Sequence, residues 1–172
     1  MDSAKPQLIA LYSSSMQSGK STVAETLQLS RGYKLVKFAD PFKTFIKDLL
    51  IAGGAPPPAA ERMVEDGTLK EKPIPGLGGV TVRRMLQTLG SEWGRDQIDS
   101  DLWVKLLARK VQECFDCGVS VVVDDLRFPN EYEGILKMGG ALGRRRPPAS
   151  LRGSPRQLPH AGTDEYRNRG AT

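Results

Sequence analysis

The sequence has few of the residues that build metal and disulfide sites. It contains two cysteines, Cys114 and Cys117, and one histidine, His160. A zinc site would need a second pair of ligands at similar spacing. A redox C-x-x-C pair lies at the start of a helix, whereas this pair falls where a helix should end. We therefore expect both cysteines to be ordinary thiols, buried or partly buried.

Long apolar runs are also absent. The start of the chain, MDSAKPQLIALY, has only a short apolar run with an aspartate before it, which is not the pattern of a signal peptide. No stretch approaches the roughly 20 apolar residues that a membrane-spanning helix needs. We expect a cytoplasmic protein with no membrane partner.

The main part of the chain has no excess charge of either sign. Residues 1–142 hold 18 basic and 18 acidic residues, so the net charge of +5 lies in residues 143–172, where seven arginines face two acidic residues. This tail is rich in Pro, Gly, Ser and Arg and has too few apolar residues to offset its ordering entropy. We expect it to be poorly structured, and we expect nucleic acid binding only through it.

The rest of the sequence alternates between strand and helix patterns. Strands are predicted at 7–12, 33–40 and 119–123, and the valine run of the last is typical of a strand buried on both faces. Helical spacing follows at 20–30, 41–53, 81–94, 99–115 and 131–140. This alternation predicts an α/β fold with a doubly wound parallel sheet and flanking helices. Ligands of such sheets bind at the carboxyl ends of the strands.

Two segments do not fit this alternation. Residues 53–79 are heavy in Gly and Pro, and we expect a mobile, lid-like insertion with at most one short helix. The stretch GGALGRRRPP, at 139–148, has too few β-branched residues for a good strand. We therefore expect one domain over 1–142, followed by a tail that stands for an incomplete lid and last strand.

The stretch SSSMQSGKST, residues 13–22, nearly matches the phosphate-binding loop G-x-x-x-x-G-K-[ST], with Ser14 in place of the first glycine. It follows a strand and opens a helix, which is the context that such a loop requires. The backbone N–H groups of residues 15–21 would surround the phosphates of ATP. Lys20 would reach the β and γ phosphates, and the Ser21 hydroxyl would ligate Mg²⁺. The pattern indicates a sheet of the P-loop NTPase type; a serine-rich turn is the alternative. The predicted cofactor-binding residues are Ser15, Gln17, Ser18, Gly19, Lys20, Ser21 and Thr22.

A pair of acidic residues ends the valine strand, in the stretch VVVDDLRF. Either Asp124 or Asp125 can hold Mg²⁺, directly or through water. Arg127 is placed to neutralise a phosphoryl group during transfer. Acidic residues at a strand end can also serve solubility alone.

Three further stretches carry a family resemblance. FADPFK, LQTLGSEWGRD and VVVDDLRFPNE together resemble the bacteriophage-type deoxynucleoside monophosphate kinases, from about residue 7 to about residue 140. The resemblance implies transfer of the γ-phosphate of ATP to a deoxynucleoside monophosphate with Mg²⁺, in the host cytoplasm if a phage encodes the chain. It implies that Lys20, Asp125 and Arg127 are catalytic and that Ser21 and Asp125 hold the metal. The residues it places around the acceptor nucleotide are Phe38, Ala39, Asp40, Lys43, Arg84, Gln87, Trp93 and Arg95.

Other functions stay open on the sequence alone. A kinase similar to dephospho-coenzyme A kinase is the nearest enzymatic alternative, although EWGRD argues against it. A non-catalytic P-loop protein that binds nucleic acid through its tail is another, and a truncated, inactive descendant of the kinases is a third. The base accepted and the oligomeric state, a homodimer included, are undetermined. We expect Arg83 to lie on the solvated face of its helix.

Overall fold

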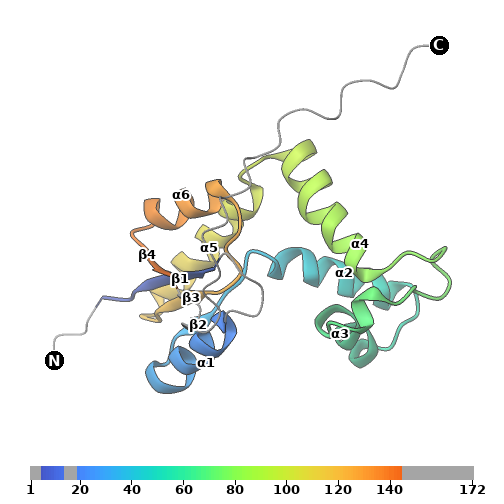
Figure 1. Ribbon diagram of the computed structural model, residues 1–172, viewed down its shortest axis with the longest axis horizontal. Coiled ribbons are helices and arrows are strands. Elements are labelled where there is room, and N and C mark those ends of the chain that lie inside the picture. Colours follow the sequence, from blue (N-terminus) through green and yellow to red (C-terminus); the bar gives the residue numbers. More distant parts are fainter. Residues whose placement is uncertain (1–4, 14–18, 145–172) are drawn as a thin grey trace, which may run out of the picture.

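The computed structural model describes residues 5–13 and 19–144. Figure 1 shows a small sheet with helices around it and a separate group of helices to one side. The elements in chain order are β1 (Leu8–Tyr12), α1 (Lys20–Arg31), β2 (Lys34–Leu35), α2 (Asp40–Ala52), α3 (Pro57–Glu65), the 3-10 helix η1 (Leu69–Glu71), α4 (Val82–Gln87), the π-helix η2 (Thr88–Ile98), α5 (Leu102–Asp116), β3 (Val121–Val123), α6 (Pro129–Lys137) and β4 (Ala141–Arg144). The expectations for the tail beyond residue 144 lie outside the described residues.

The described strands form one parallel sheet in the order β2-β3-β1-β4. Val121 of β3 pairs with Leu8 on one side and with Lys34 on the other. Val121, Val122 and Val123 are fully buried, as the continuous valine run predicts for a strand covered on both faces. The predicted α/β fold with a parallel sheet is confirmed.

Helices cover both faces of this sheet. On one face Ala24 of α1 packs with Tyr33, Leu11 and Val122. On the other face, α5 and α6 bury Trp103, Leu107, Val111 and Ile135 against Val121 and Val123. In Figure 1, α1 and α6 lie on opposite sides of the strands. The sheet is therefore doubly wound, as predicted.

The strand order creates a switch point at β1 and β3. After β1 the chain passes through α1 to β2, on one side of β1, whereas after β3 it passes through α6 to β4, on the other side. The connections leave these two neighbouring strands in opposite directions, which opens a crevice at their carboxyl ends. The carboxyl ends of β1, at Tyr12, and of β3, at Val123, border this crevice.

The last strand corrects one prediction. Residues 139–148 have weak strand propensity, yet β4 forms at Ala141–Arg144 and pairs with β1 from Ile9 to Tyr12. The exposed edge of β1 supplies hydrogen-bonding partners, and this pairing overrides the propensity of the segment. Gly143 also suits the place, because a Cβ there would approach the Leu11 side chain to 2.9 Å.

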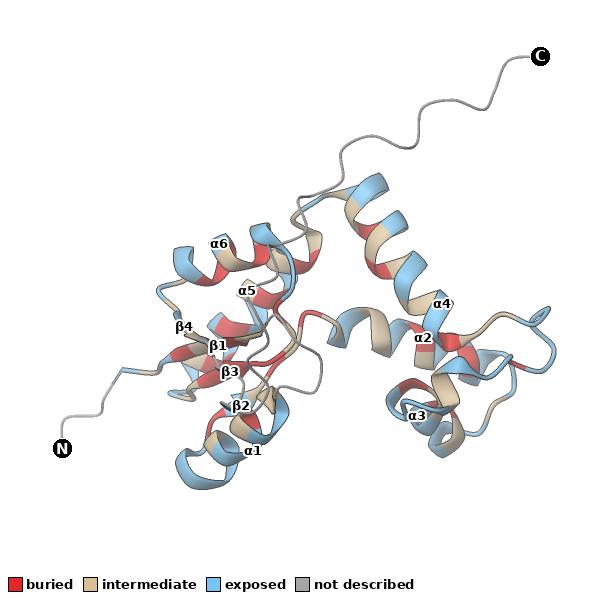
Figure 2. Cartoon of the chain, viewed as in Figure 1, coloured by how far each residue is buried: buried red, intermediate tan, exposed pale blue. Residues whose placement is uncertain are grey.

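The segment 53–79 packs more closely than its Gly- and Pro-rich sequence indicated, while its mobility and lid-like role stay a prediction. It contains α3 and η1, and its Ala60, Val64 and Ile74 are buried against Ile46 of α2 and Val82 of α4. Figure 2 shows these buried positions in red where α2, α3 and α4 meet. The segment is part of a second hydrophobic core, so it does more than lie over the fold as a lid-like loop.

The α5 helix buries the row Trp103, Leu107, Val111 and Cys114. Leu106 is 39% exposed. Both cysteines are free thiols, Cys114 buried as expected and Cys117 exposed.

Trp103 connects α5 to η2. Its indole Nε1–H donates to the Gly90 carbonyl at 2.6 Å, and its ring packs edge-on against Phe42. Gly90 and Gly94 are both buried, and a Cβ at Gly94 would overlap the indole ring. The two glycines therefore let the π-helix approach the sheet domain closely.

Trp103→Phe tests this contact. We expect a loss of about 1–3 kcal/mol in the free energy of unfolding, because the hydrogen bond to Gly90 disappears and the smaller ring leaves space. Urea denaturation measures it. Trp93→Phe is the control, since Trp93 is 43% exposed and its change should stay within about 0.5 kcal/mol. Equal effects of the two substitutions would contradict the role given to Trp103.

Candidate active site

The predicted phosphate-binding loop leads into α1 as expected. The helix begins at Lys20, and Gly19 before it has φ 74°, in the left-handed region that favours glycine. Gly19, Lys20, Ser21 and Thr22 therefore lie at a helix N-terminus just beyond the end of β1. There the helix dipole and the first backbone N–H groups favour an anion. Ser15, Gln17 and Ser18 lie outside the described residues.

Asp124 is the acidic residue that meets this helix. It is buried, and its Oδ2 accepts a hydrogen bond from the Ser21 hydroxyl at 3.2 Å. Lys37 Nζ lies 3.4 Å from its Oδ1, although no hydrogen bond within the described part of the chain reaches that oxygen. A buried carboxylate oxygen without a hydrogen bond, next to a serine hydroxyl, is an arrangement that suits a hard cation.

Asp125 faces the opposite way. Its two oxygens accept the backbone N–H groups of Phe38 and Ala39 at 3.1 and 3.0 Å. Burial raises the pKa of Asp125 to about 6, although these two hydrogen bonds act to lower it. Side chains alternate at the end of a strand, so the carboxylates point to different sides. The sequence paired Ser21 with Asp125 as metal ligands, but the structure places Asp124 beside Ser21.

A cavity of about 320 Å³ lies next to Asp125. Several predicted residues meet there from distant parts of the chain: Phe38, Ala39, Lys43, Gln87, Arg95, Asp125 and Arg127. Its other lining residues were not predicted site residues; they are Lys37, Phe42, Lys70, Arg83, Leu86, Gly90, Ser91, Phe128 and Glu131. The two sets together come from the turn after β2, from α2, η1, α4 and η2, from the segment after β3 and from α6. The sheet crevice and the second group of helices thus share this cavity.

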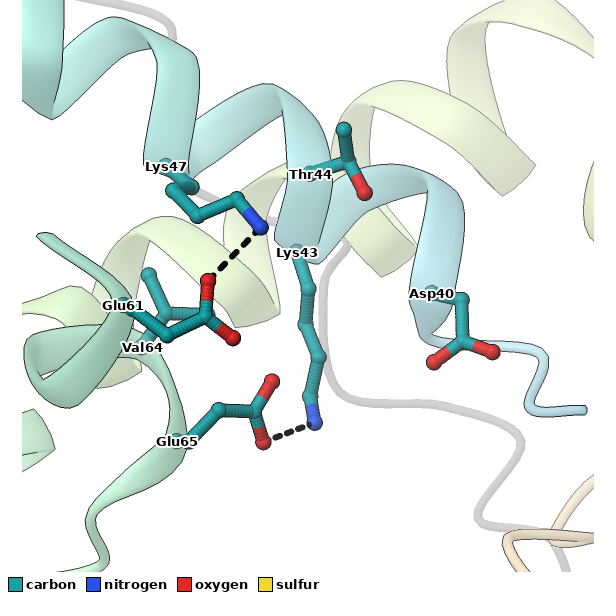
Figure 3. Close-up of a pocket in the computed structure, with 7 residues that line it drawn as sticks. All are labelled: Asp40, Lys43, Thr44, Lys47, Glu61, Val64 and Glu65. Atoms are coloured by element: carbon teal, nitrogen blue, oxygen red, sulfur yellow. Dashed lines mark hydrogen bonds and ion pairs between the residues drawn. The ribbon is translucent and has the colours of Figure 1, made fainter. Parts of the chain in front are cut away.

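Three predicted residues lie elsewhere. Arg84 and Trp93 line a separate apolar hollow of about 380 Å³. Arg83 is exposed, as expected, and it also lines the cavity with Gln87, four positions on along the helix. Asp40 accepts the backbone N–H of Lys37 at 2.8 Å and lines a smaller pocket between α2 and α3 (Figure 3).

Arg95 lines the cavity but is held by protein groups. Its guanidinium pairs with Glu131, which is 2% exposed, and lies 3.9 Å from the centroid of the Phe128 ring. The other oxygen of Glu131 accepts the backbone N–H groups of Arg127 and Phe128 at 2.7 and 3.1 Å. Glu131 therefore joins η2 to the start of α6 and orients the turn that carries Arg127. No sequence signal marked it beyond its place at the end of RFPNE.

The lining of the cavity is strongly basic. Lys37, Lys43, Lys70, Arg83, Arg95 and Arg127 line it, against the two acidic residues Asp125 and Glu131. Lys70 was missed because it lies in the Gly- and Pro-rich segment that the sequence indicated as a lid. An excess of cations around a cavity at strand ends favours an anionic ligand such as a phosphate group.

Comparison with known proteins relates the chain to one family. The family described as "Deoxynucleotide monophosphate kinase" matches residues 67–142. A protein of Acanthamoeba polyphaga mimivirus named "Putative deoxynucleotide monophosphate kinase" is 31% identical over 140 residues, which are 73% of this chain and 66% of that protein. The chain is similar to the deoxynucleotide monophosphate kinase family over these regions. This confirms the resemblance carried by LQTLGSEWGRD and VVVDDLRFPNE.

A second viral relative of the chain is uncharacterized protein ORF77 of Ictalurid herpesvirus 1 (strain Auburn). It is 35% identical over 89 residues, which are 50% of this chain and 38% of that protein. The chain thus spans less than two thirds of the length of both relatives. The family match contains Lys70, Arg83, Arg95 and Arg127 but does not reach the predicted phosphate-binding loop.

Two features are absent from residues 5–13 and 19–144. No helix there has the length and apolar character needed to cross a membrane. Nor does any group of three or more His, Cys, Asp or Glu side chains come together as a metal site within residues 5–13 and 19–144. A magnesium ion in a P-loop kinase needs fewer protein ligands, because phosphate oxygens and waters complete its shell.

Proposed function

We propose that the chain is a kinase that transfers the γ-phosphoryl group of ATP to a deoxynucleoside monophosphate. The observation that supports this most is the position of the basic cavity. It adjoins the carboxyl end of β3, whose Asp124 contacts the Ser21 hydroxyl in the first turn of α1. A donor site at the helix N-terminus and an acceptor site in the cavity would then face each other across Asp124 and Asp125.

The reaction needs positioning and positive charge more than covalent help. An oxygen of the acceptor phosphate forms a bond to the γ-phosphorus as the bond from that phosphorus to the bridging oxygen of ADP breaks. The products are ADP and a deoxynucleoside diphosphate. Lys20 would hold the β and γ phosphates of ATP, and Arg127 would stabilise the charge on the group in transfer. Phe38, Phe42 and Gln87 would hold the nucleoside.

The residues near α1 fit a magnesium ion. Asp124 Oδ1 is buried and accepts no hydrogen bond from the described residues, and the Ser21 hydroxyl contacts the other oxygen of the same carboxylate. When bound, Mg²⁺ would neutralise charge on the β and γ phosphates. We propose Ser21 and Asp124 as the residues that hold it, with Asp125 keeping the turn at Phe38 and Ala39 in place.

The direct test is a product assay. Purified protein with ATP and Mg²⁺ is incubated with each deoxynucleoside and ribonucleoside monophosphate, and diphosphates and ADP are separated by chromatography. We expect equal amounts of ADP and of one or more deoxynucleoside diphosphates. ADP without a second diphosphate would indicate an ATPase, and no turnover with any acceptor would contradict the proposal.

Asp124→Asn separates the two aspartates. We expect kcat to fall about tenfold to a hundredfold and the Mg²⁺ concentration for half-maximal rate to rise, because a charged oxygen next to the metal is lost. Asp48→Asn, on the exposed face of α2, is the control and should change neither. The unfolding midpoint of each variant is measured alongside. If the magnesium requirement of Asp124→Asn is unchanged, Asp125 rather than Asp124 is the metal ligand.

A further inference from the structure

Two lysines that line the basic cavity also contact a glutamate, Glu65, which does not itself line the cavity. Glu65, near the end of α3, places its carboxylate 2.7 Å from Lys43 Nζ (Figure 3). Its backbone carbonyl accepts a hydrogen bond from Lys70 Nζ at 3.2 Å. The two lysines come from α2 and η1, and both line the cavity. Glu65 therefore lies where the two cations converge.

The charges around Glu65 also indicate that several cations converge on it. Burial acts to raise the pKa of Glu65, but the hydrogen bond and charge of Lys43, with the charges of Lys70 and Lys37, lower it below its ordinary value. The pKa of Lys70 is also shifted, below its ordinary value. Burial lowers its pKa, and the nearby charges of Lys43, Arg83 and Lys37 lower it further, although Glu65 acts to raise it. Four cations thus act on one small region.

A second carboxylate has the same relation to the cavity. Glu71 of η1 accepts a hydrogen bond from Arg83 Nε of α4 at 2.7 Å. Arg83 lines the cavity and Glu71 does not. Glu65 and Glu71 both come from the α3–η1 segment, and each binds a cation that another element presents to the cavity.

The geometry points to Lys43, Lys70 and Arg83 as the subsite for the phosphate of the acceptor nucleotide, with Glu65 and Glu71 as internal competitors that the phosphate displaces. This inference rests on the proposed function for the identity of the ligand, a nucleoside 5′-monophosphate. A phosphate monoester carries up to two negative charges and three acceptor oxygens, so it can engage more of these cations than a single carboxylate can. Displacing Glu65 and Glu71 would loosen the ion pairs that hold the α3–η1 segment to α2 and α4.

The pocket of Figure 3 supplies a matched control. Lys47 and Glu61 form an ion pair between the same two helices at the same 2.7 Å separation, and Glu61 is exposed to a similar extent as Glu65. Lys47 lines the small pocket between α2 and α3 but not the basic cavity. Removing the charge of Glu61 should therefore leave acceptor binding alone.

The test measures binding without ATP, so it does not depend on turnover. The Kd of dAMP, dGMP, dCMP and dTMP, and of the corresponding nucleosides, is measured by titration calorimetry for the wild type and each variant. We expect Glu65→Gln to tighten monophosphate binding about threefold to tenfold and Glu61→Gln to leave it unchanged. Lys70→Met should weaken monophosphate binding at least about tenfold, and none of the three should alter nucleoside binding.

Three outcomes would overturn the inference. They are monophosphates that bind the wild type no better than their nucleosides, a Glu65→Gln variant that matches Glu61→Gln, and a Lys70→Met variant with unchanged affinity. The proposed function can fail separately from this inference. A protein that binds monophosphates through Lys70 but forms no diphosphate would support the subsite and contradict the kinase activity. Unfolding midpoints confirm that each variant is folded.

Discussion

Lys20→Ala should lower kcat by about a hundredfold to a thousandfold while the free energy of unfolding changes by less than about 1 kcal/mol. Lys20 is the first residue of α1, is only partly buried and belongs to none of the described core clusters, so we expect a small effect on stability. In the proposed reaction its ammonium group holds the β and γ phosphates, where negative charge shifts as the bond to ADP breaks. Steady-state kinetics with the best acceptor, together with urea denaturation, measures both quantities.

The control for this experiment is Lys34→Ala. Lys34 lies in β2 at the edge of the described sheet, is exposed and lines none of the cavities described above. Both variants lose one positive charge, so a general effect of net charge on ATP binding would appear in both. A Lys20→Ala variant with kcat within threefold of the wild type would make the GKST stretch a serine-rich turn rather than a phosphate-binding loop.

Arg95→Ala should destabilise the protein by about 3–5 kcal/mol, because it leaves the buried carboxylate of Glu131 without its cation. Arg95 is itself largely buried, with 13% of its side chain exposed, and it also contacts the Phe128 ring. The sequence alone implied a role on the acceptor phosphate, for which the main effect of Arg95→Ala would be a higher KM for the monophosphate. From the structure we instead expect the main effect on the free energy of unfolding, which urea denaturation measures.

A double variant distinguishes the two explanations. Arg95→Met should be strongly destabilising, and adding Glu131→Gln should recover part of the loss, because the neutral amide removes the unpaired charge. In Glu131→Gln, the oxygen of the new side-chain amide can still accept the backbone N–H groups of Arg127 and Phe128. If Arg95→Met instead keeps wild-type stability and raises KM for the monophosphate tenfold, Arg95 contacts the substrate as the sequence implied.

Local signals in the sequence determined the sheet domain. The valine run 119–123 and the apolar run 7–12 each contain enough β-branched or apolar residues to predict a buried strand without knowledge of their partners. GKST, at the end of the loop that follows a strand, predicted the start of α1 at Lys20, because Gly19 and the helix N-terminus are neighbours in the chain. These predictions held since each depends on residues within one element and its flanking turn.

Only the tertiary structure decided which side chains meet. Successive residues of a helix differ by about 100° in direction, so whether Arg83 or Arg84 enters the cavity depends on how α4 packs on α2 and α3. Asp124 and Asp125 likewise point to different sides, because side chains alternate in direction at the end of β3. Asp124 therefore contacts Ser21, whereas Asp125 contacts the backbone of Phe38 and Ala39. The burial of Ala60 and Val64 in a Gly- and Pro-rich segment, and the formation of β4 along β1, depend on partners far away in the sequence. For the arginines and the aspartates the sequence named the right stretch, and long-range packing chose the residue within it. For residues 53–79 and for β4, long-range packing overrode what the local sequence indicated.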